Sequence, residues 1–152
     1  MARGLCMKQN FGLLVASCLA VIAALLIVGA VSSGVIRHIV QTSPLWIAIV
    51  LGARRSHWVK WAAFPCFVFW LLLMTAIWLF LLGWARIVSG TFSPTEIAMT
   101  VIVGLASLVG MAEAWRVKSS ALLWPAVGTV LLVAALQVGA FRLSLLPAIA
   151  HL

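Results

Sequence analysis

Only two side chains among the 152 residues are acidic, Glu96 and Glu113, and both are glutamates. Hydrolysis by acid–base catalysis needs two carboxylates that reach the same bond. On one helix these two would lie about 25 Å apart and could not meet. A Ser-His-Asp triad would need an aspartate, and the chain has neither a nucleophile motif nor a phosphate-binding glycine loop. We therefore predict that the protein is not an enzyme.

Each glutamate has a local structural explanation. Glu96 follows Ser93 by three residues, with a proline directly after the serine, which predicts a helix capping box. Glu113 precedes Arg116 by three residues, which predicts an ion pair along one helix face. Because an acidic group in a membrane segment is a functional candidate, Glu113 with Arg116 also remains open as an ion or proton site.

Histidine and cysteine are too dispersed to predict a metal or haem site. His38, His57 and His151 lie at or beyond the ends of apolar segments, and the three cysteines form no CxxC pair. His38 and His57 could meet only if the segment between them does not cross a membrane. A tryptophan-rich face could seat a quinone or a pigment, but nothing in the sequence selects either. We expect no metal ion and no cofactor.

The best binding candidate is a run of six basic and aromatic side chains, which we call the basic-aromatic cluster: Arg54, Arg55, His57, Trp58, Lys60 and Trp61. Basic residues contact anionic lipid headgroups, and tryptophan is enriched at the membrane interface. The cluster predicts lipid or partner binding, or more simply a topology anchor. The net charge of +8 comes from residues scattered beside apolar segments, so we expect no nucleic-acid partner.

The elements that position these residues are transmembrane helices. The chain is 66% hydrophobic and 8% charged, and its apolar runs are continuous rather than alternating, which favours helices over a barrel. We predict an all-α, polytopic transmembrane bundle that forms one domain over residues 1–152, with spans at about residues 11–35, 62–87, 94–116 and 120–141. The first run is too long for a signal peptide, so we expect it to remain as a span.

The segment around Pro44 decides the number of crossings. Ser43 and Pro44 are typical of a helix start, which predicts a short interfacial or re-entrant helix at 44–53. A helix that begins near Val35 would instead reach about 19 residues and could cross. Span length favours four spans plus the short helix, whereas positive charge favours five spans, with seven basic residues inside and three outside. Both interpretations place the 54–61 and 116–118 loops in the cytoplasm.

Small residues recur every fourth position in three spans and predict close helix–helix contacts. They are Gly12, Ala16, Ala20 and Ala24 in the first span, Ala106 and Gly110 in the third, and Ala135 and Gly139 in the fourth. Inside a helix, the side-chain amide of Gln137 cannot easily find hydrogen-bond partners on its own backbone. Because it should lie at the depth of Thr100, we predict a contact between these two side chains.

These features suggest a small integral membrane protein without chemistry of its own. We expect a structural, accessory or assembly subunit of a larger membrane complex, because its loops are short and its small-residue faces suit helix partners. The alternative is a homo-oligomeric transporter or channel, in which either Glu113 or the arginine-rich ends would form rings between copies. The expected partners are anionic membrane lipids and either other membrane subunits or copies of the chain, in a bacterial inner membrane.

Overall fold

The chain folds into a bundle of antiparallel helices. The computed structural model describes residues 11–86 and 90–150. Its helices are α1 (Phe11–Val31), α2 (Val35–Ala53), α3 (Val59–Leu81), α4 (Pro94–Arg116), α5 (Leu123–Ser144) and the one-turn α6 (Pro147–Ala150). The first five are each long and apolar enough to cross a membrane. The prediction of an all-α membrane bundle is confirmed.

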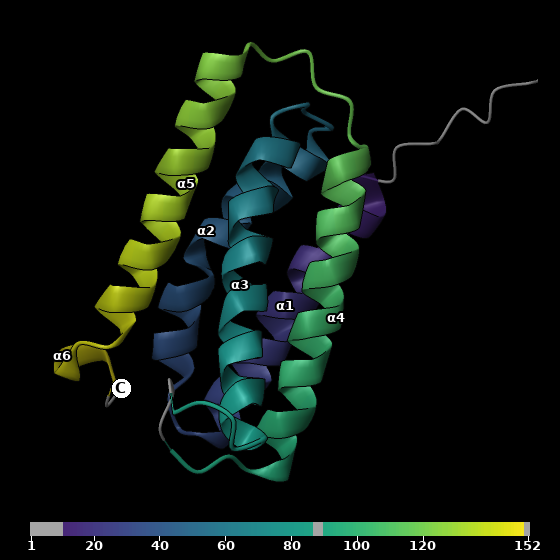
Figure 1. The fold of residues 1–152 in the computed structure, drawn as a ribbon. Coiled ribbons are helices and arrows are strands. Elements are labelled where there is room, and N and C mark those ends of the chain that lie inside the picture. Colours follow the sequence, from purple (N-terminus) through teal and green to yellow (C-terminus); the bar gives the residue numbers. More distant parts are fainter. Residues whose placement is uncertain (1–10, 87–89, 151–152) are drawn as a thin grey trace, which may run out of the picture.

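Successive long helices run in opposite directions, so the connections gather at two ends (Figure 1). One end holds the start of α1 and the loops 54–58 and 117–122, and we call it the basic end. The other holds the turn at 32–34, the connection from α3 to α4, and α6. We call this second end the pocket end, for the cavity described below.

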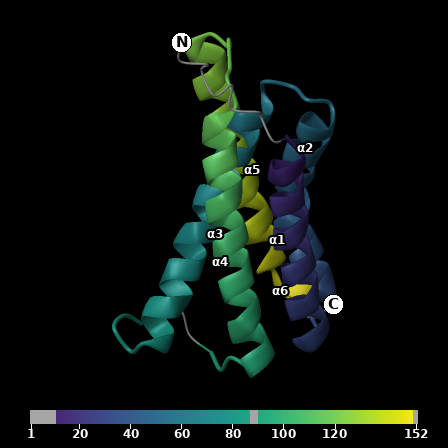
Figure 2. The same cartoon turned by 90° about the vertical axis from the view of Figure 1, so that its right-hand side faces the viewer.

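Helices α1 to α4 form a four-helix core, and α5 lies outside it. Helix α1 packs against α2 and α4, while α3 packs against the same two helices from the other side. Figure 2 shows α1 and α4 side by side, with α5 behind them. The largest fully buried side chains include Trp70, Phe67, Leu14 and Leu45. Helix α5 packs against α2 and α3 and makes no contact with α4 in the described part of the chain.

The helix predicted at 44–53 is instead a 19-residue helix that begins at Val35 and contains Pro44. The short-helix boundaries were wrong, and the boundaries expected for five spans are the observed ones. Proline inside a helix removes one backbone donor and leaves the carbonyl four residues earlier without its partner. Here that carbonyl is the one of Val40, and the Ser43 hydroxyl donates to it at 2.8 Å. Serine hydroxyls satisfy freed carbonyls in membrane helices in this way.

The first span is shorter than predicted, because residues 32–34 form a tight turn. Ser33 adopts a positive φ of 56°, and the Gly34 N–H donates to the Gly29 carbonyl at 2.8 Å. A Cβ on Gly29 would lie 2.9 Å from Cδ2 of His38. The glycine therefore lets the start of α2 lie against the end of α1.

The remaining boundaries agree with the sequence to different degrees. Helix α4 has the predicted bounds and the predicted capping box, in which the Ser93 hydroxyl accepts from the Glu96 N–H at 3.3 Å and the Ser93 N–H donates to Glu96 Oε2 at 2.7 Å. Helices α3 and α5, predicted at 62–87 and 120–141, occupy Val59–Leu81 and Leu123–Ser144. The basic-aromatic cluster thus overlaps the first turn of α3.

The small-residue faces have different environments. On α1, Gly12 and Ala16 are exposed, Ala20 is half-buried and Ala24 is buried, so the described part of the chain does not cover the first two. The inward face of α1 is formed by larger residues such as Leu14 and Val21.

On α4, Ala106 is half-buried, whereas Gly110 is buried directly against the ring of Phe67 on α3. On α5, Ala135 is exposed and Gly139 is half-buried. Both line a groove between α2 and α5. Among the described glycines, Gly110 is the one at which an added Cβ would lie nearest to another atom, in the Phe67 ring.

Candidate functional site

The basic-aromatic cluster divides into an exposed and an engaged part. Arg54, Arg55 and His57 are exposed at the basic end. Lys60 and Trp61 instead face the end of α4. The Lys60 Nζ lies 5.1 Å from the ring centroid of Trp115, within the range of a cation–π interaction.

Two further contacts organise the rest of the cluster. The indole N–H of Trp61 donates to the hydroxyl of Ser119 at 2.9 Å, which connects α3 to the loop after α4. The rings of His57 and Trp58 lie 5.3 Å apart. The arginines are therefore exposed, whereas Lys60 and Trp61 contact α4 and the loop after it. Lipid or partner binding by the cluster stays a prediction.

Glu113 forms the predicted ion pair with Arg116 on α4. Its side chain is buried, at 5% exposure, whereas that of Arg116 is 53% exposed. The second carboxylate oxygen, Oε2, has no hydrogen-bond partner among the described residues. The pair stabilises a buried acid near the basic end, and its use as an ion or proton site stays a prediction.

The histidines do not come together. His38 lies near the start of α2 and His57 follows its end, and a helix of this length separates its two ends by about 28 Å. His151 lies outside the described residues. Of the cysteines, Cys18 and Cys66 are fully buried in the core, as expected for small apolar packing residues, and Cys6 lies outside the described residues.

The predicted contact between Gln137 and Thr100 is wrong. The Thr100 hydroxyl donates within its own helix, to the Ile97 carbonyl at 2.7 Å. The side-chain amide of the fully buried Gln137 donates to the backbone carbonyl of Gln41 at 3.0 Å. The side-chain amide of Gln41 in turn donates to the Ser144 hydroxyl at 2.9 Å. These hydrogen bonds join α5 to α2. The prediction failed because a similar depth of Gln137 and Thr100 in the membrane does not show which helices are neighbours.

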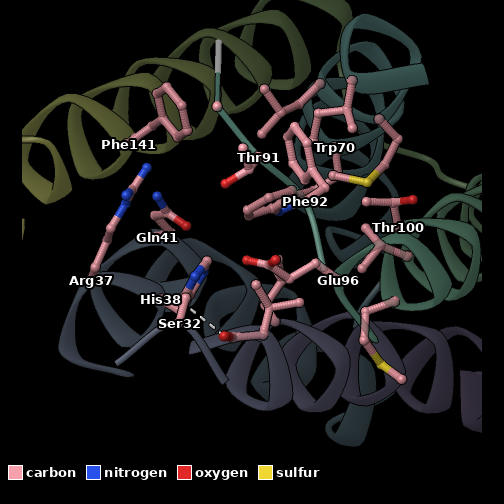
Figure 3. A pocket seen from close by; sticks show the side chains of 18 residues that line it. Ser32, Arg37, His38, Gln41, Trp70, Thr91, Phe92, Glu96, Thr100 and Phe141 are labelled. Atoms are coloured by element: carbon pink, nitrogen blue, oxygen red, sulfur yellow. Dashed lines mark hydrogen bonds between the residues drawn. The ribbon is translucent and has the colours of Figure 1, made fainter. Parts of the chain in front are cut away.

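A cavity of about 320 Å³ lies at the pocket end, and all five long helices contribute to its lining (Figure 3). Its polar side chains include Arg37, His38 and Gln41 from α2 and Glu96 from α4. Its apolar lining includes Trp70, Met74, Ile77, Phe92 and Phe141. A volume near 300 Å³ lies at the lower end of the range for small-molecule sites.

Three nitrogen atoms in this lining are buried without a hydrogen-bond partner in the described part of the chain. They are Arg37 Nε, His38 Nδ1 and Trp70 Nε1. Sequence reasoning placed Arg37 and His38 at the mouth of a possible span and missed the cavity, because its walls come from helices that are far apart in the chain. The available signal was Arg37, His38 and Gln41 on one face of a helix starting at Val35.

No protein-family model matches the chain, and neither a curated protein nor a solved structure does. The geometry of the two ends therefore carries the functional interpretation. The basic end presents exposed arginines, and the pocket end presents a cavity lined by nitrogen atoms that have no hydrogen-bond partner among the described residues.

Proposed function

We propose that this chain is a non-catalytic subunit of a larger membrane complex and that its partner packs against the first half of α5. The observation that carries the proposal is the loose attachment of this helix. In its most apolar stretch 17% of the residues are buried, against 28–39% in the other four long helices. Figure 1 shows the start of α5 standing apart from α3 and α4.

The exposed surface of this half-helix suits another helix. Leu123, Trp124 and Leu131 are 69%, 83% and 65% exposed, and a Cβ on Gly128 would meet no atom within 4 Å. Large apolar side chains supply packing area, and a small residue lets a second backbone approach closely. Exposed leucines alone would suit lipid equally well, but the glycine and the open side toward α4 favour a partner helix.

The orientation follows from charge, on the proposal that all five helices cross. The basic end then carries five described basic residues, namely Arg54, Arg55, Lys60, Arg116 and Lys118, and the pocket end carries Arg37, Arg86 and Arg142. The positive-inside rule supports a cytoplasmic basic end. We further propose a bacterial inner membrane, where the exposed arginines would contact anionic headgroups, each worth about 1 kcal/mol.

The homo-oligomeric transporter has less support. Of the two rings that this function offered, the one of Glu113 is disfavoured, because its carboxylate is buried within one bundle and paired with Arg116. A ring of arginine-rich ends stays a prediction.

Site-specific photo-crosslinking tests the subunit proposal. A photoreactive residue at Val127 on α5 is compared with one at Leu19 on α1, which has similar exposure (40% and 45%). We expect a different membrane protein to be captured from Val127 and not from Leu19. Capture of a second copy would favour the homo-oligomer instead, and lipid adducts alone from both positions would overturn the proposal.

A further inference from the structure

The cavity at the pocket end contains buried nitrogen atoms that lack acceptors. Trp70 is 1% exposed, and its Nε1 has no partner among the described residues. Arg37 Nε, which is always a donor, and His38 Nδ1, which is a donor or an acceptor according to the tautomer, also have no partner there, and both side chains are half-buried. Because a buried donor left unpaired destabilises a fold by about 1–3 kcal/mol, we infer that Trp70 and Arg37 donate to an occupant that supplies acceptors.

The walls between these groups are aromatic and apolar. Figure 3 shows Arg37, His38 and Gln41 on one side of the cavity and Trp70 on another, with Phe92 between them. Water could satisfy individual nitrogen atoms, but it would wet the apolar lining. A flat organic ring that bears acceptor oxygens would contact both kinds of surface.

An apolar groove lies next to the cavity and shares part of its wall. Met74 on α3 and Thr100 on α4 line the cavity, and they also line a groove of about 390 Å³ between these two helices. Along the groove, Leu105 and Leu108 are 59% and 50% exposed, and Gly104 leaves open space beside the backbone. The groove therefore lies on the lipid-facing surface, where it suits a flexible hydrocarbon chain attached to a polar head in the cavity.

The charges in the lining favour a neutral head. Arg37 and Glu96 contribute one positive and one negative formal charge to the lining. Figure 3 shows the Glu96 carboxylate directed toward the side that holds His38 and Gln41. A phosphate or carboxylate head would gain from Arg37 but would be repelled by Glu96, whereas neutral carbonyl oxygens accept hydrogen bonds without that repulsion.

We propose that the cavity binds the head of a membrane quinone and that the groove between α3 and α4 holds its isoprenoid tail. The quinone ring lies among Trp70, Phe92 and Phe141, and its two carbonyl oxygens accept from Trp70 on one side and from His38 or Arg37 on the other. The proposal concerns binding alone and includes no electron transfer. It does not rest on the partner proposed for the first half of α5.

Binding of decylubiquinone to the purified full chain in detergent tests this proposal. Saturable quenching of tryptophan fluorescence and a rise in the unfolding temperature are the two readouts. Trp70→Phe keeps the ring and removes the donor, so we expect about three- to tenfold weaker binding, the equivalent of one hydrogen bond. Trp46→Phe is the matched control, because Trp46 is an exposed tryptophan outside the cavity lining.

The groove is tested separately with Gly104→Leu. This variant should weaken decylubiquinone binding and leave the binding of a tail-less dimethoxy-methyl-benzoquinone unchanged. His38→Ala provides a second head variant should Trp70→Phe fail to fold. The proposal is overturned by absent saturation with the wild-type chain, by unchanged affinity in both head variants, or by stronger stabilisation from phosphatidylglycerol that depends on the same residues.

Discussion

Replacing Gly110 with alanine should weaken the packing of α4 on α3. Gly110 is buried, and a Cβ there would overlap three carbon atoms of the Phe67 ring, the farthest of them 2.7 Å away. Carbon atoms in favourable contact are separated by about 3.5–4.0 Å. Because Phe67 is fully buried, its ring can move aside only by displacing other core atoms.

The expected magnitude follows from two opposing effects. Overpacking of a well-packed core destabilises by about 1–3 kcal/mol. Alanine also favours the helical backbone over glycine by up to ~1 kcal/mol. Gly104→Ala on the same helix is the matched control, because a Cβ at Gly104 meets no atom within 4 Å. The stability difference between the two variants therefore isolates the overlap, and we expect Gly110→Ala to be the less stable by about 1–3 kcal/mol.

The assay is SDS-induced unfolding in mixed micelles, followed by tryptophan fluorescence. A double-mutant cycle adds specificity: Phe67→Leu removes ring atoms, so combining it with Gly110→Ala should destabilise less than the sum of the single changes, with a coupling of about 0.5–3 kcal/mol. Equal stability of the Gly110 and Gly104 variants would refute the reasoning. Strict additivity with Phe67→Leu would refute the assignment of the overlap to that ring.

Three further predictions concern topology and helix contacts. Cysteines introduced at Ser33 and Ser56, with the native cysteines replaced, should be labelled from opposite sides of the membrane, and labelling from one side would mean that α2 does not cross. Gln137→Leu should lower the free energy of unfolding by about 0.5–2 kcal/mol, because it removes an interhelical hydrogen bond. Thr100→Val breaks only a bond within its own helix and should have a smaller effect. A larger effect of Thr100→Val would contradict the structure. Trp61→Phe should lower the free energy of unfolding by about 0.5–1.5 kcal/mol in the same assay, because it removes the hydrogen bond between α3 and the loop after α4. An unchanged free energy would show that this hydrogen bond makes no net contribution to stability.

Helix α4 was predictable because its signals are local. The serine, proline and glutamate of the capping box all lie within four residues, and Arg116 marks the other end. The Glu113–Arg116 pair was predictable for the same reason, since three residues along a helix bring side chains to one face. Short-range rules of this kind apply whatever the rest of the chain does.

The start of helix α2 was harder to predict than that of α4. Pro44 argues against a continuous helix, because it cannot donate to the carbonyl of Val40. The sequence alone does not show whether that carbonyl finds another donor. The structure supplies that donor one residue away, from Ser43 to Val40. A Ser-Pro pair is therefore compatible with a helix start or with a compensated helix interior. Here span length favoured the wrong one, whereas the distribution of positive charge favoured the observed boundaries.

The cavity and the α5 contacts were beyond the sequence because they depend on helix order in space. Depth along a span predicted Gln137 beside Thr100, but α5 packs outside the four-helix core against α2 and α3. Periodicity shows which residues share a face of one helix and does not show which helix that face meets.

Gln41 lies where the proposed partner and the proposed ligand would influence each other. The backbone carbonyl of Gln41 accepts from the Gln137 side chain, and the side-chain amide of Gln41 donates to the Ser144 hydroxyl. Gln41 therefore holds the pocket end of α5, and its side chain also lines the cavity. Helix α5 is thus anchored at one end and loosely packed at the other, and a partner that draws its start outward would act on the hydrogen bonds of Gln41. Gln137→Leu tests this connection without the partner: we expect weaker decylubiquinone binding although Gln137 is not part of the cavity lining. Unchanged affinity in a folded variant would show that α5 and the cavity act independently.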